Sequence, residues 1–565
     1  MVKQSTGSAF VGALVIGGVL VTSTIPGCSS SPSCQDTRTC DALGGVASYE
    51  DGGEGGEVAG VGGSAAENAG AGGARDLDAA GAGGAAGSAG AAEHPALTLT
   101  IAPIVRVRRG GSVDVNVNVT RIGTASGAIK VTIDGLPAGV GAQTLSLSEA
   151  QAAGTFKLKA LQSAAVGGPT GISITAVDAD DAALSNTAGA TLFVSGAPAE
   201  ADESFGVAGS VVHSFTTRED YVQDLAIDAR DRIVLAGAGE GVGPWIGWAA
   251  RLLPNGVLDP EFGIGGQVAN FGPTSTTTSA DKVAIIGDDA VFAISSGNAG
   301  GTYFLRKLTE NGTAAPGFGT GGDVILPDGL RALLHRERGL LALTFPEFKL
   351  YAYADSGAAD LSFKPPANVF SIALATDRNN RILFGGAAAQ DGDFTVTRLT
   401  ADGALDSSFG KSGTATVQAT VVHKLIRVSS VIAVPDGRTV FLGDAQFGAY
   451  DQSRVSLFRL DSKGAIDSAF GTGGELMLTP EGLGLAAILQ DDGKVVALYA
   501  DRLPNELLSC ALARIGEDGK LDLSFAVSGV LKLACPDDIY YEQPGNRLLI
   551  VDHAAEGIQL KRIWL

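Results

Sequence analysis

Aspartate recurs at one place in a repeated phrase, and repeated carboxylates are the first candidates for chemistry. The phrase reads Arg-Leu, a Gly four residues later, then Leu-Asp-x-x-Phe-Gly-x-x-Gly, and a clear copy runs from Arg251 to Gly266. Carboxylates gathered in a ring could bind a metal ion. They could instead accept backbone N–H groups of their own loops and pair with the repeated arginine, and this alternative is favoured because turn-forming aspartate is the commoner case. The acids are Asp202, Asp259, Asp360, Asp406, Asp467 and Asp522.

Histidine and tryptophan offer little further chemistry. The chain contains no His-x-His, His-Glu-x-x-His or Cys-x-x-Cys and no nucleophile elbow. The histidines take different positions within the repeat, so no ring of imidazole ligands is expected. Trp245 lies in the loop Gly239–Gly247 and is either an exposed aromatic anchor for a ligand or a cap on a sheet edge. The sequence therefore predicts no catalytic residue, no metal ligand and no cofactor. The histidines are His94, His213, His335, His423 and His553.

The repeat predicts the elements that position these residues. Each segment reads as four short strands, which in the first segment are Gly209–Phe215, Val222–Asp228, Arg232–Gly237 and Trp248–Leu253. Four antiparallel strands per roughly 50 residues are typical of a propeller blade, and blades must stack to bury their faces. Seven segments predict a seven-bladed ring. The phenylalanines that mark them are Phe205, Phe262, Phe318, Phe363, Phe409, Phe470 and Phe525.

Two copies of the phrase are degenerate. Ala315 replaces the aspartate in the third copy, and in the fourth Lys364, Pro365 and Pro366 follow Phe363 in place of the glycine. The sequence leaves open whether the ring closes by placing the first strand of the repeat region beside Gln559–Leu565 in the last blade.

The phrase resembles the delta-sixty repeat, a β-propeller repeat family of secreted and surface proteins, many of them from myxobacteria. The resemblance covers residues 201–565. It implies a β-propeller and an extracellular location, and it implies no particular activity.

The N-terminal region predicts export and anchoring. The apolar run Ala9–Val21 after Lys3 is too short to span a bilayer and suits a signal peptide over residues 1–27. Ile25 to Cys28 resembles a bacterial lipobox, which implies lipidation at Cys28, although signal cleavage with Cys28 lost or paired is the alternative. Residues 28–94 are rich in Gly and Ala and predict a disordered tether.

Residues 95–197 predict a β-sandwich. Ser112 to Thr120 alternates apolar and polar residues, as a half-buried strand does. The stretch from Lys130 to Val140 resembles a bacterial immunoglobulin-like (Ig-like) domain.

The cysteines predict disulfides once Cys28 is set aside. Cys34 and Cys40 could close a small loop. Cys510 and Cys535 are predicted on the last strand of one segment and the first strand of the next, where a bond would join neighbouring blades.

Charge and composition limit the function. The net charge of −21 argues against nucleic acid, which needs a basic face. We expect a lipid-anchored protein of the cell envelope, on the periplasmic or outer side of the outer membrane, that presents the propeller to a protein or glycan. Two alternatives stay open: a propeller hydrolase or lyase with a metal in the central channel, and an outer-membrane assembly factor.

Overall fold

The computed structural model describes residues 95–565 with short gaps, and two N-terminal strands, β1 (Leu14–Ile16) and β2 (Val19–Val21), which pair with each other. The gaps are 241–242, 272–275, 298–300, 368, 370, 372, 388–392, 419–424, 447–452, 503–507, 537, 543–545 and 555. The rest of the predicted signal peptide, the tether, Cys28, Cys34, Cys40, His94 and His423 lie outside the described residues. Among the described residues every regular element is a β-strand, and no helix long and apolar enough to cross a membrane is found.

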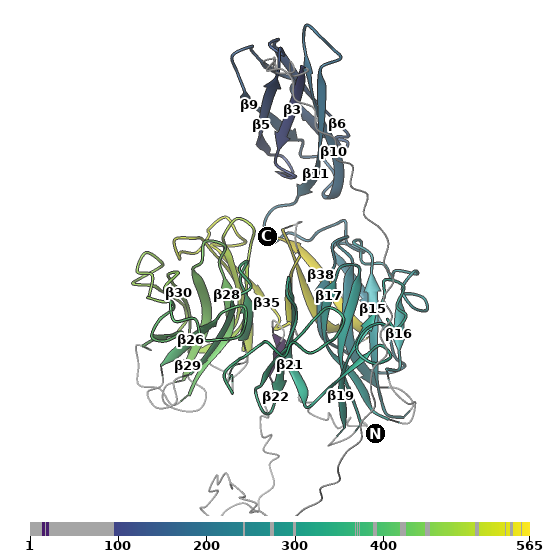
Figure 1. Cartoon of the computed structure of the whole chain (residues 1–565), viewed down its shortest axis with the longest axis vertical. Helices are drawn as coiled ribbons and strands as arrows, with labels where there is room; N and C mark the ends of the chain where they lie inside the picture. The colour runs from purple at the N-terminus through teal and green to yellow at the C-terminus, as the bar shows by residue number, and fades with distance from the viewer. Residues whose placement is uncertain are drawn as a thin grey trace, which may run out of the picture. The chain divides into compact units, whose positions relative to one another are not determined.

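Residues from 95 to 195 form two sheets that share one hydrophobic core. The predicted alternating strand lies in β5, where Val115, Val117 and Val119 are buried between exposed polar neighbours. The first sheet has the order β3 (Ala96–Ile101), β5 (Ser112–Ile122), β9 (Ala153–Ala160), β7 (Val140–Ala142). The second has the order β4 (Ile104–Arg108), β11 (Ser185–Ser195), β10 (Gly167–Asp178), β6 (Ile129–Asp134), β8 (Leu145–Leu147) (Figure 1).

The remaining described residues form seven consecutive antiparallel sheets, six of four strands and one of three. The first three are β13 (Asp220–Ile227), β14 (Ile233–Glu240), β15 (Trp245–Leu252), β16 (Gln267–Ala269); β17 (Thr278–Ile286), β18 (Asp289–Ser296), β19 (Thr302–Leu308), β20 (Asp323–Leu326); and β21 (Gly329–Arg336), β22 (Gly339–Phe345), β23 (Leu350–Tyr353). The fourth and fifth are β24 (Ala373–Thr376), β25 (Ile382–Ala387), β26 (Phe394–Leu399), β27 (Thr414–Val417); and β28 (Leu425–Ala433), β29 (Thr439–Gln446), β30 (Ser453–Leu460), β31 (Glu475–Thr479). The sixth and seventh are β32 (Gly482–Leu489), β33 (Val495–Arg502), β34 (Leu508–Ile515), β35 (Val530–Leu533); and β36 (Asp538–Glu542), β37 (Arg547–Ala554), β38 (Gly557–Trp564), β12 (Ser210–His213).

Tight turns and bulges shape these sheets. Several hairpins between the first and second strands contain residues of positive φ, such as Asp231 at 60° and Gly437 at 92°. In five sheets the first strand carries a β-bulge at a corresponding place. A bulge re-aims the next side chain. After the bulge in β13, Asp224 accepts a hydrogen bond from the backbone N–H of Val283 in the next sheet at 3.0 Å.

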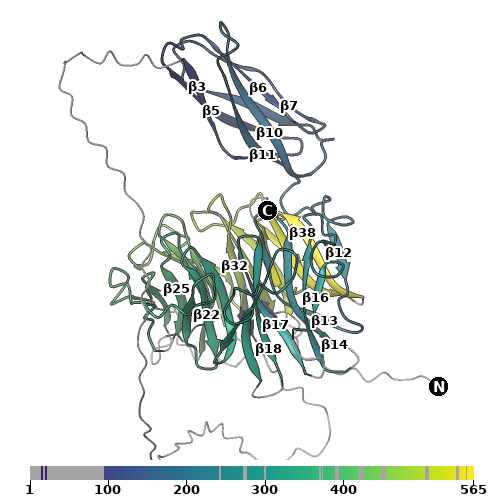
Figure 2. The ribbon, with the colours of Figure 1, turned by 45° about the vertical axis from the view of Figure 1, so that its right-hand side comes forward.

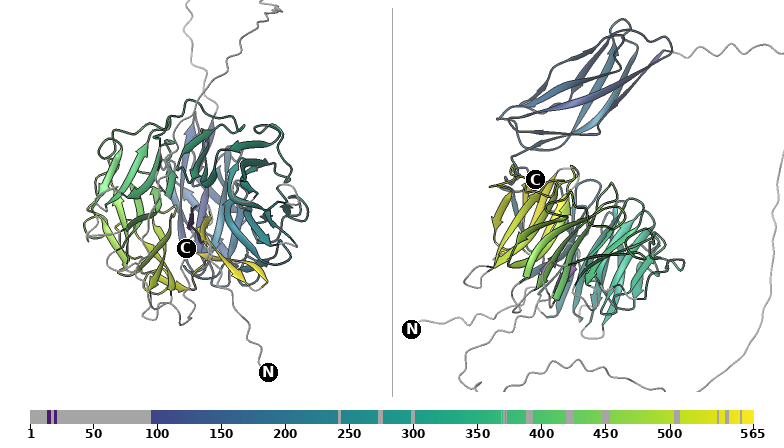
Figure 3. Two further views of the ribbon diagram at one scale, coloured as in Figure 1. Left: turned by 90° about the horizontal axis from the view of Figure 1, so that it is seen from below. Right: turned by 90° about the vertical axis from the view of Figure 1, so that its left-hand side faces the viewer.

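Apolar side chains join each sheet to the next. Seven buried clusters lie between consecutive sheets, and one of them joins the seventh sheet to the first through Leu549 and Leu560 on one side and Leu235 and Trp248 on the other. The sheets are therefore arranged around a centre, as the view from below shows (Figure 3).

The ring closes through a strand from the start of the repeat region. The prediction that Gly209–Phe215 belongs to the first segment is wrong, because β12 pairs with β38 and is the outer strand of the seventh sheet (Figure 2). The sheets are thus displaced by one strand from the repeated phrase. Within the described residues the prediction of four strands per segment also fails in the third sheet, which ends at β23.

A disulfide joins Cys510 and Cys535. Cys510 lies on β34 and Cys535 follows β35, the outer strand of the same sheet. The predicted position between neighbouring blades is therefore wrong, since the bond fastens the end of the sixth sheet to its own third strand.

Candidate functional site

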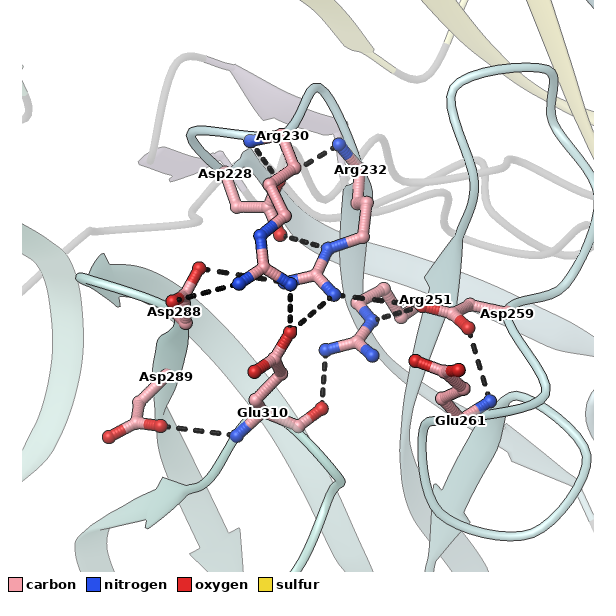
Figure 4. A network of polar contacts seen from close by, with 9 residues as sticks. All are labelled: Asp228, Arg230, Arg232, Arg251, Asp259, Glu261, Asp288, Asp289 and Glu310. Atoms are coloured by element: carbon pink, nitrogen blue, oxygen red, sulfur yellow. Dashed lines mark hydrogen bonds and ion pairs between the residues drawn. The ribbon is translucent and has the colours of Figure 1, made fainter.

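The repeated aspartates are held by the repeated arginines. In the first sheet the Nε of Arg251 donates to the Oδ2 of Asp259 at 2.8 Å (Figure 4). The guanidinium of Arg251 lies over the ring of Phe262 at 4.9 Å. The same triad occurs in four further copies: Arg398, Asp406 and Phe409; Arg459, Asp467 and Phe470; Arg514, Asp522 and Phe525; and Arg562, Asp202 and Phe205. In these five copies an Arg–Asp ion pair and a cation–π contact thus fix the phrase at the end of the third strand.

The second oxygen of each carboxylate holds its own loop. The Oδ1 of Asp259 accepts the N–H of Glu261 at 3.1 Å, and the Oδ1 of Asp406 accepts the N–H of Ser408 at 3.0 Å. One carboxylate oxygen therefore accepts from the repeated arginine and the other from the backbone of the loop, as expected if these aspartates hold their own loops. Among the described residues no group of three His, Cys, Asp or Glu side chains is placed to hold a metal ion.

A second cation approaches the same aspartate, and sequence reasoning missed it. Arg232 follows the hairpin turn of the first sheet; its Nε donates to Asp228 at 2.6 Å, and its NH1 lies 3.9 Å from Asp259 (Figure 4). The sequence signal that could have revealed this second cation is an Arg or Lys directly after the hairpin turn between the first and second strands, which occurs in five copies. The equivalent pairs are Arg381 with Asp406, Arg438 with Asp467, Lys494 with Asp522 and Arg547 with Asp202.

The two degenerate copies depart from this geometry. In the third copy Lys307 replaces the arginine and its Nζ lies 3.1 Å from Asp289. In the fourth copy Arg336, from a different strand, lies over Phe363 at 5.5 Å. Burial lowers the pKa of Arg336. Asp360 hydrogen-bonds Ser362, and that bond lowers the pKa of Asp360.

The ion pairs and loop hydrogen bonds of the repeated aspartates predict that the folded protein loses stability in acid. Burial alone would raise the pKa of Asp522, but hydrogen bonds from Ser524 and the charges of Arg514 and Lys494 lower it from 3.8 to about 2. Because the pKa is depressed in the folded state, ionised Asp522 stabilises the fold above about pH 4, and this contribution is lost as the pH falls toward 2. We expect Asp522→Asn to reduce stability by on the order of 1 kcal/mol near pH 6, because solvent screens part of the interaction.

Thermal unfolding of both proteins from pH 6 to pH 2 measures this effect. The difference in melting temperature should shrink as the pH falls through that window. A difference that stays constant down to pH 2 would contradict the assignment.

An aromatic cluster lies where the first and seventh sheets meet. The ring of Tyr221, on β13, stacks on Trp245, on β15, with centroids 5.4 Å apart, and His553, on β37, lies 4.6 Å from Tyr221. Tyr221 and Trp245 are partly exposed and His553 is exposed. We call Tyr221, Trp245 and His553 the aromatic platform. The interpretation of Trp245 as an exposed aromatic anchor for a ligand therefore stays open, because its indole stacks on Tyr221 and still reaches solvent.

Charged side chains border the aromatic platform. The Oη of Tyr221 donates to the Oε2 of Glu219 at 2.8 Å, and Arg218 pairs with Glu240 at 3.2 Å. Glu240 and Trp245 are opposite each other in the β14–β15 ladder. The site thus combines aromatic faces with carboxylates that can accept hydroxyl or N–H donors.

The other described histidines take separate places. The Nε2 of His213 lies 2.9 Å from the carbonyl of Gly256, and the Nε2 of His335 lies 3.0 Å from Asp355. They share no site with each other.

A hollow of about 380 Å³ lies between the second and third sheets. It is lined by Asp281, Lys282, Ser295 and Tyr303 among others. Burial raises the pKa of Asp281, while hydrogen bonds from Ser279 and Ser295 oppose that rise. A carboxyl group whose pKa is raised beside hydroxyl groups in a hollow is one feature of a general-acid site, so this hollow is a second candidate site.

Comparisons with known proteins agree with the fold. A family model described as "Domain of unknown function (DUF5122) beta-propeller" matches residues 378–409, which include β25 and β26. Together with the ring of sheets, this match defines an all-β protein with a β-propeller, and the prediction of that fold is confirmed. No curated protein matches the chain in sequence.

Two solved structures of NanB align with much of the chain. One, "NanB plus Optactamide", has 10% identity and a TM-score of 0.31, covering 80% of this chain and 83% of that one. The other, NanB sialidase from Streptococcus pneumoniae with 2-[(3-chlorobenzyl)ammonio]ethanesulfonate, has 10% identity and a TM-score of 0.31, covering 81% and 84%. Likenesses this distant carry no argument about activity.

Proposed function

We propose that this chain is a lipid-anchored binding protein of the cell envelope whose propeller takes a glycan on one face. In this proposal the seven sheets are the blades of a seven-bladed ring of the delta-sixty type, and residues 95–197 are an Ig-like stalk. Cys28 carries the lipid at the outer membrane, and residues 28–94 are the tether. The resemblances at the N-terminus and in the repeat support these parts, and incorporation of labelled palmitate at Cys28 tests the anchor.

The aromatic platform carries the glycan proposal. A sugar ring presents an apolar face that packs on Trp and Tyr rings, while its hydroxyl groups need acceptors. Trp245 and Tyr221 supply the aromatic faces, and Glu219 and Glu240 supply carboxylates beside them. Three strands from two sheets build the site, so the fold rather than a single loop positions it.

Replacement of Trp245 by Ala should weaken glycan binding at least tenfold, because an aromatic contact of this kind contributes roughly 1 kcal/mol beyond the area it buries. Calorimetric titration with maltohexaose, cellohexaose and hexameric N-acetylglucosamine measures this. Ile325→Ala is the control, since it removes an exposed apolar side chain from the second sheet, away from the aromatic platform. Failure of the intact protein to bind any of the three, or an equal loss in both variants, would count against the platform.

A hydrolase is the second proposal, and the hollow around Asp281 favours it. Release of reducing ends from the same oligosaccharides, abolished by Asp281→Asn, would support it. An outer-membrane assembly factor is a third proposal, which co-purification with barrel assembly components would support.

A further inference from the structure

A buried arginine of the third sheet has an unused hydrogen-bonding edge. Arg336, the last residue of β21, is 5% exposed, and its NH1 donates to the carbonyls of Asn380 at 3.2 Å and Ala401 at 2.8 Å. Its Nε and NH2 are buried too, and neither atom has a hydrogen-bond partner among the described residues. A guanidinium presents these two N–H groups side by side, as a fork that matches the oxygens of a small anion.

The guanidinium of Arg336 takes the place of an arginine that the fourth copy of the phrase lacks. In an intact copy the arginine of the third strand lies over the repeated phenylalanine and donates to a carbonyl of the next sheet, as Arg398 does to Ser462 at 2.9 Å. Arg336 comes from the first strand of its sheet, yet it lies over Phe363 and donates to Ala401 in the same way.

A hollow marks the position of the missing arginine side chain. Ala352 stands at that position, because its carbonyl accepts the N–H of Asp360 just as the carbonyl of Arg398 accepts the N–H of Asp406, both at 2.9 Å. Ala352, Asp360 and Phe363 correspond to the three members of an intact triad, and all three line a hollow of about 350 Å³, which we call the Ala352 hollow. A water molecule takes about 30 Å³ of liquid, so the hollow has room for an ion of a few atoms.

The buried charge of Arg336 lacks the direct counter-ion that the intact copies have. In the five intact triads a carboxylate oxygen lies within 3.0 Å of the guanidinium. Asp360 hydrogen-bonds Ser362 in its own loop, and within the described part of the chain it forms no ion pair with Arg336. Burial and the charge of Arg338 lower the pKa of Arg336, and the charges of Asp360 and Asp402 oppose this shift without cancelling it. Because burying a cation without a partner is costly, an anion that neutralises it binds favourably.

We propose that the Ala352 hollow binds a small monovalent anion, of the size of chloride or formate, which the Nε–H and NH2–H groups of Arg336 hold. The anion takes the part that the second oxygen of the repeated aspartate has in an intact triad. An anion is favoured over a water molecule, because water satisfies the two donors but leaves the charge uncompensated. The site is separate from the aromatic platform and does not rest on the glycan proposal.

Crystals of the protein soaked in sodium bromide test the position of the ion. Bromide scatters anomalously, and we expect an anomalous peak within hydrogen-bonding distance of both Nε and NH2 of Arg336. An ordered water molecule without anomalous signal at that position would overturn the proposal. An Asp360 side chain turned onto Arg336 would overturn it as well.

Thermal unfolding in increasing concentrations of sodium bromide measures binding in solution. The melting temperature of the intact protein should rise by about 2 °C for each tenfold increase above the dissociation constant, because the ion binds only the folded protein. Arg336→Met should lose this rise but keep any effect that salt has on the rest of the molecule. Arg338→Met is the matched control and should keep the rise, since Arg338 is an exposed neighbour that pairs with Asp402.

Asp360→Asn distinguishes an ion from solution from a counter-ion within the chain. The variant removes a carboxylate that repels the bound ion, so bromide should bind at least as tightly as it does to the intact protein. A response to bromide that appears only in Asp360→Asn would overturn the proposal, because Asp360 would then be the counter-ion of Arg336. An equal rise in the intact protein and in Arg336→Met would also overturn it, and bromide in the crystal would then be an adventitious ion only. If Arg336→Met does not fold, the crystals and the Asp360→Asn comparison decide.

Discussion

Removal of Ile558–Leu565 should unfold the ring of sheets. These residues make up most of β38, which pairs with β37 on one side and β12 on the other. The deletion also removes the buried side chains of Trp564 and Arg562, and it takes Ile558 and Leu560 out of the cluster that joins the seventh sheet to the first. The loss exceeds the roughly 5–15 kcal/mol that keeps a domain folded, so no cooperative thermal transition of the propeller should remain.

Replacement of Thr414–Val417 by a Gly-Ser linker of equal length is the control for this deletion. It removes the outer strand of the fourth sheet but leaves the closure between β12 and β38 intact. Circular dichroism and differential scanning calorimetry should find a lowered but cooperative transition in the control. If the truncated chain melts like the intact one, ring closure does not depend on β38.

The sequence predicted the sheets better than it predicted their boundaries. The phrase around each phenylalanine is a local signal, because its arginine and aspartate lie eight residues apart, as Arg251 and Asp259 do. Closure is not local: β12 and β38 are brought together from opposite ends of the repeat region, and no pattern within one copy distinguishes β12 from other outer strands. For this reason the sequence placed β12 in the first sheet, whereas the structure places it in the seventh.

The sites were predicted less completely for the same reason. Trp245 was singled out as an aromatic in a glycine-rich loop, but Tyr221, on which it stacks, and His553, which contacts Tyr221, come from two other strands.

Replacement of Asp202 by Ala should be the most damaging single substitution in the repeated phrase. Asp202 is fully buried, and the Nε of Arg562 donates to its Oδ2 at 2.7 Å while Arg547 lies 3.8 Å away. The variant removes the carboxylate that the buried Arg562 guanidinium contacts at 2.7 Å, while Arg547 keeps Asp231 at 3.8 Å. Removing one partner of a buried ion pair costs about 3–5 kcal/mol, because the remaining charge is uncompensated. Chemical denaturation of both proteins measures the difference.

Asp360→Ala is the matched control, because Asp360 occupies the same place in the fourth copy, where Ala352 replaces the arginine. Its carboxylate hydrogen-bonds Ser362 in its own loop, so its loss should change stability little. The double variant Asp202→Leu with Arg562→Met should recover part of the stability lost in Asp202→Ala, since apolar side chains then replace the buried pair. Equal losses from Asp202→Ala and Asp360→Ala would mean that strand pairing and apolar packing hold the seventh sheet to the first without the ion pair.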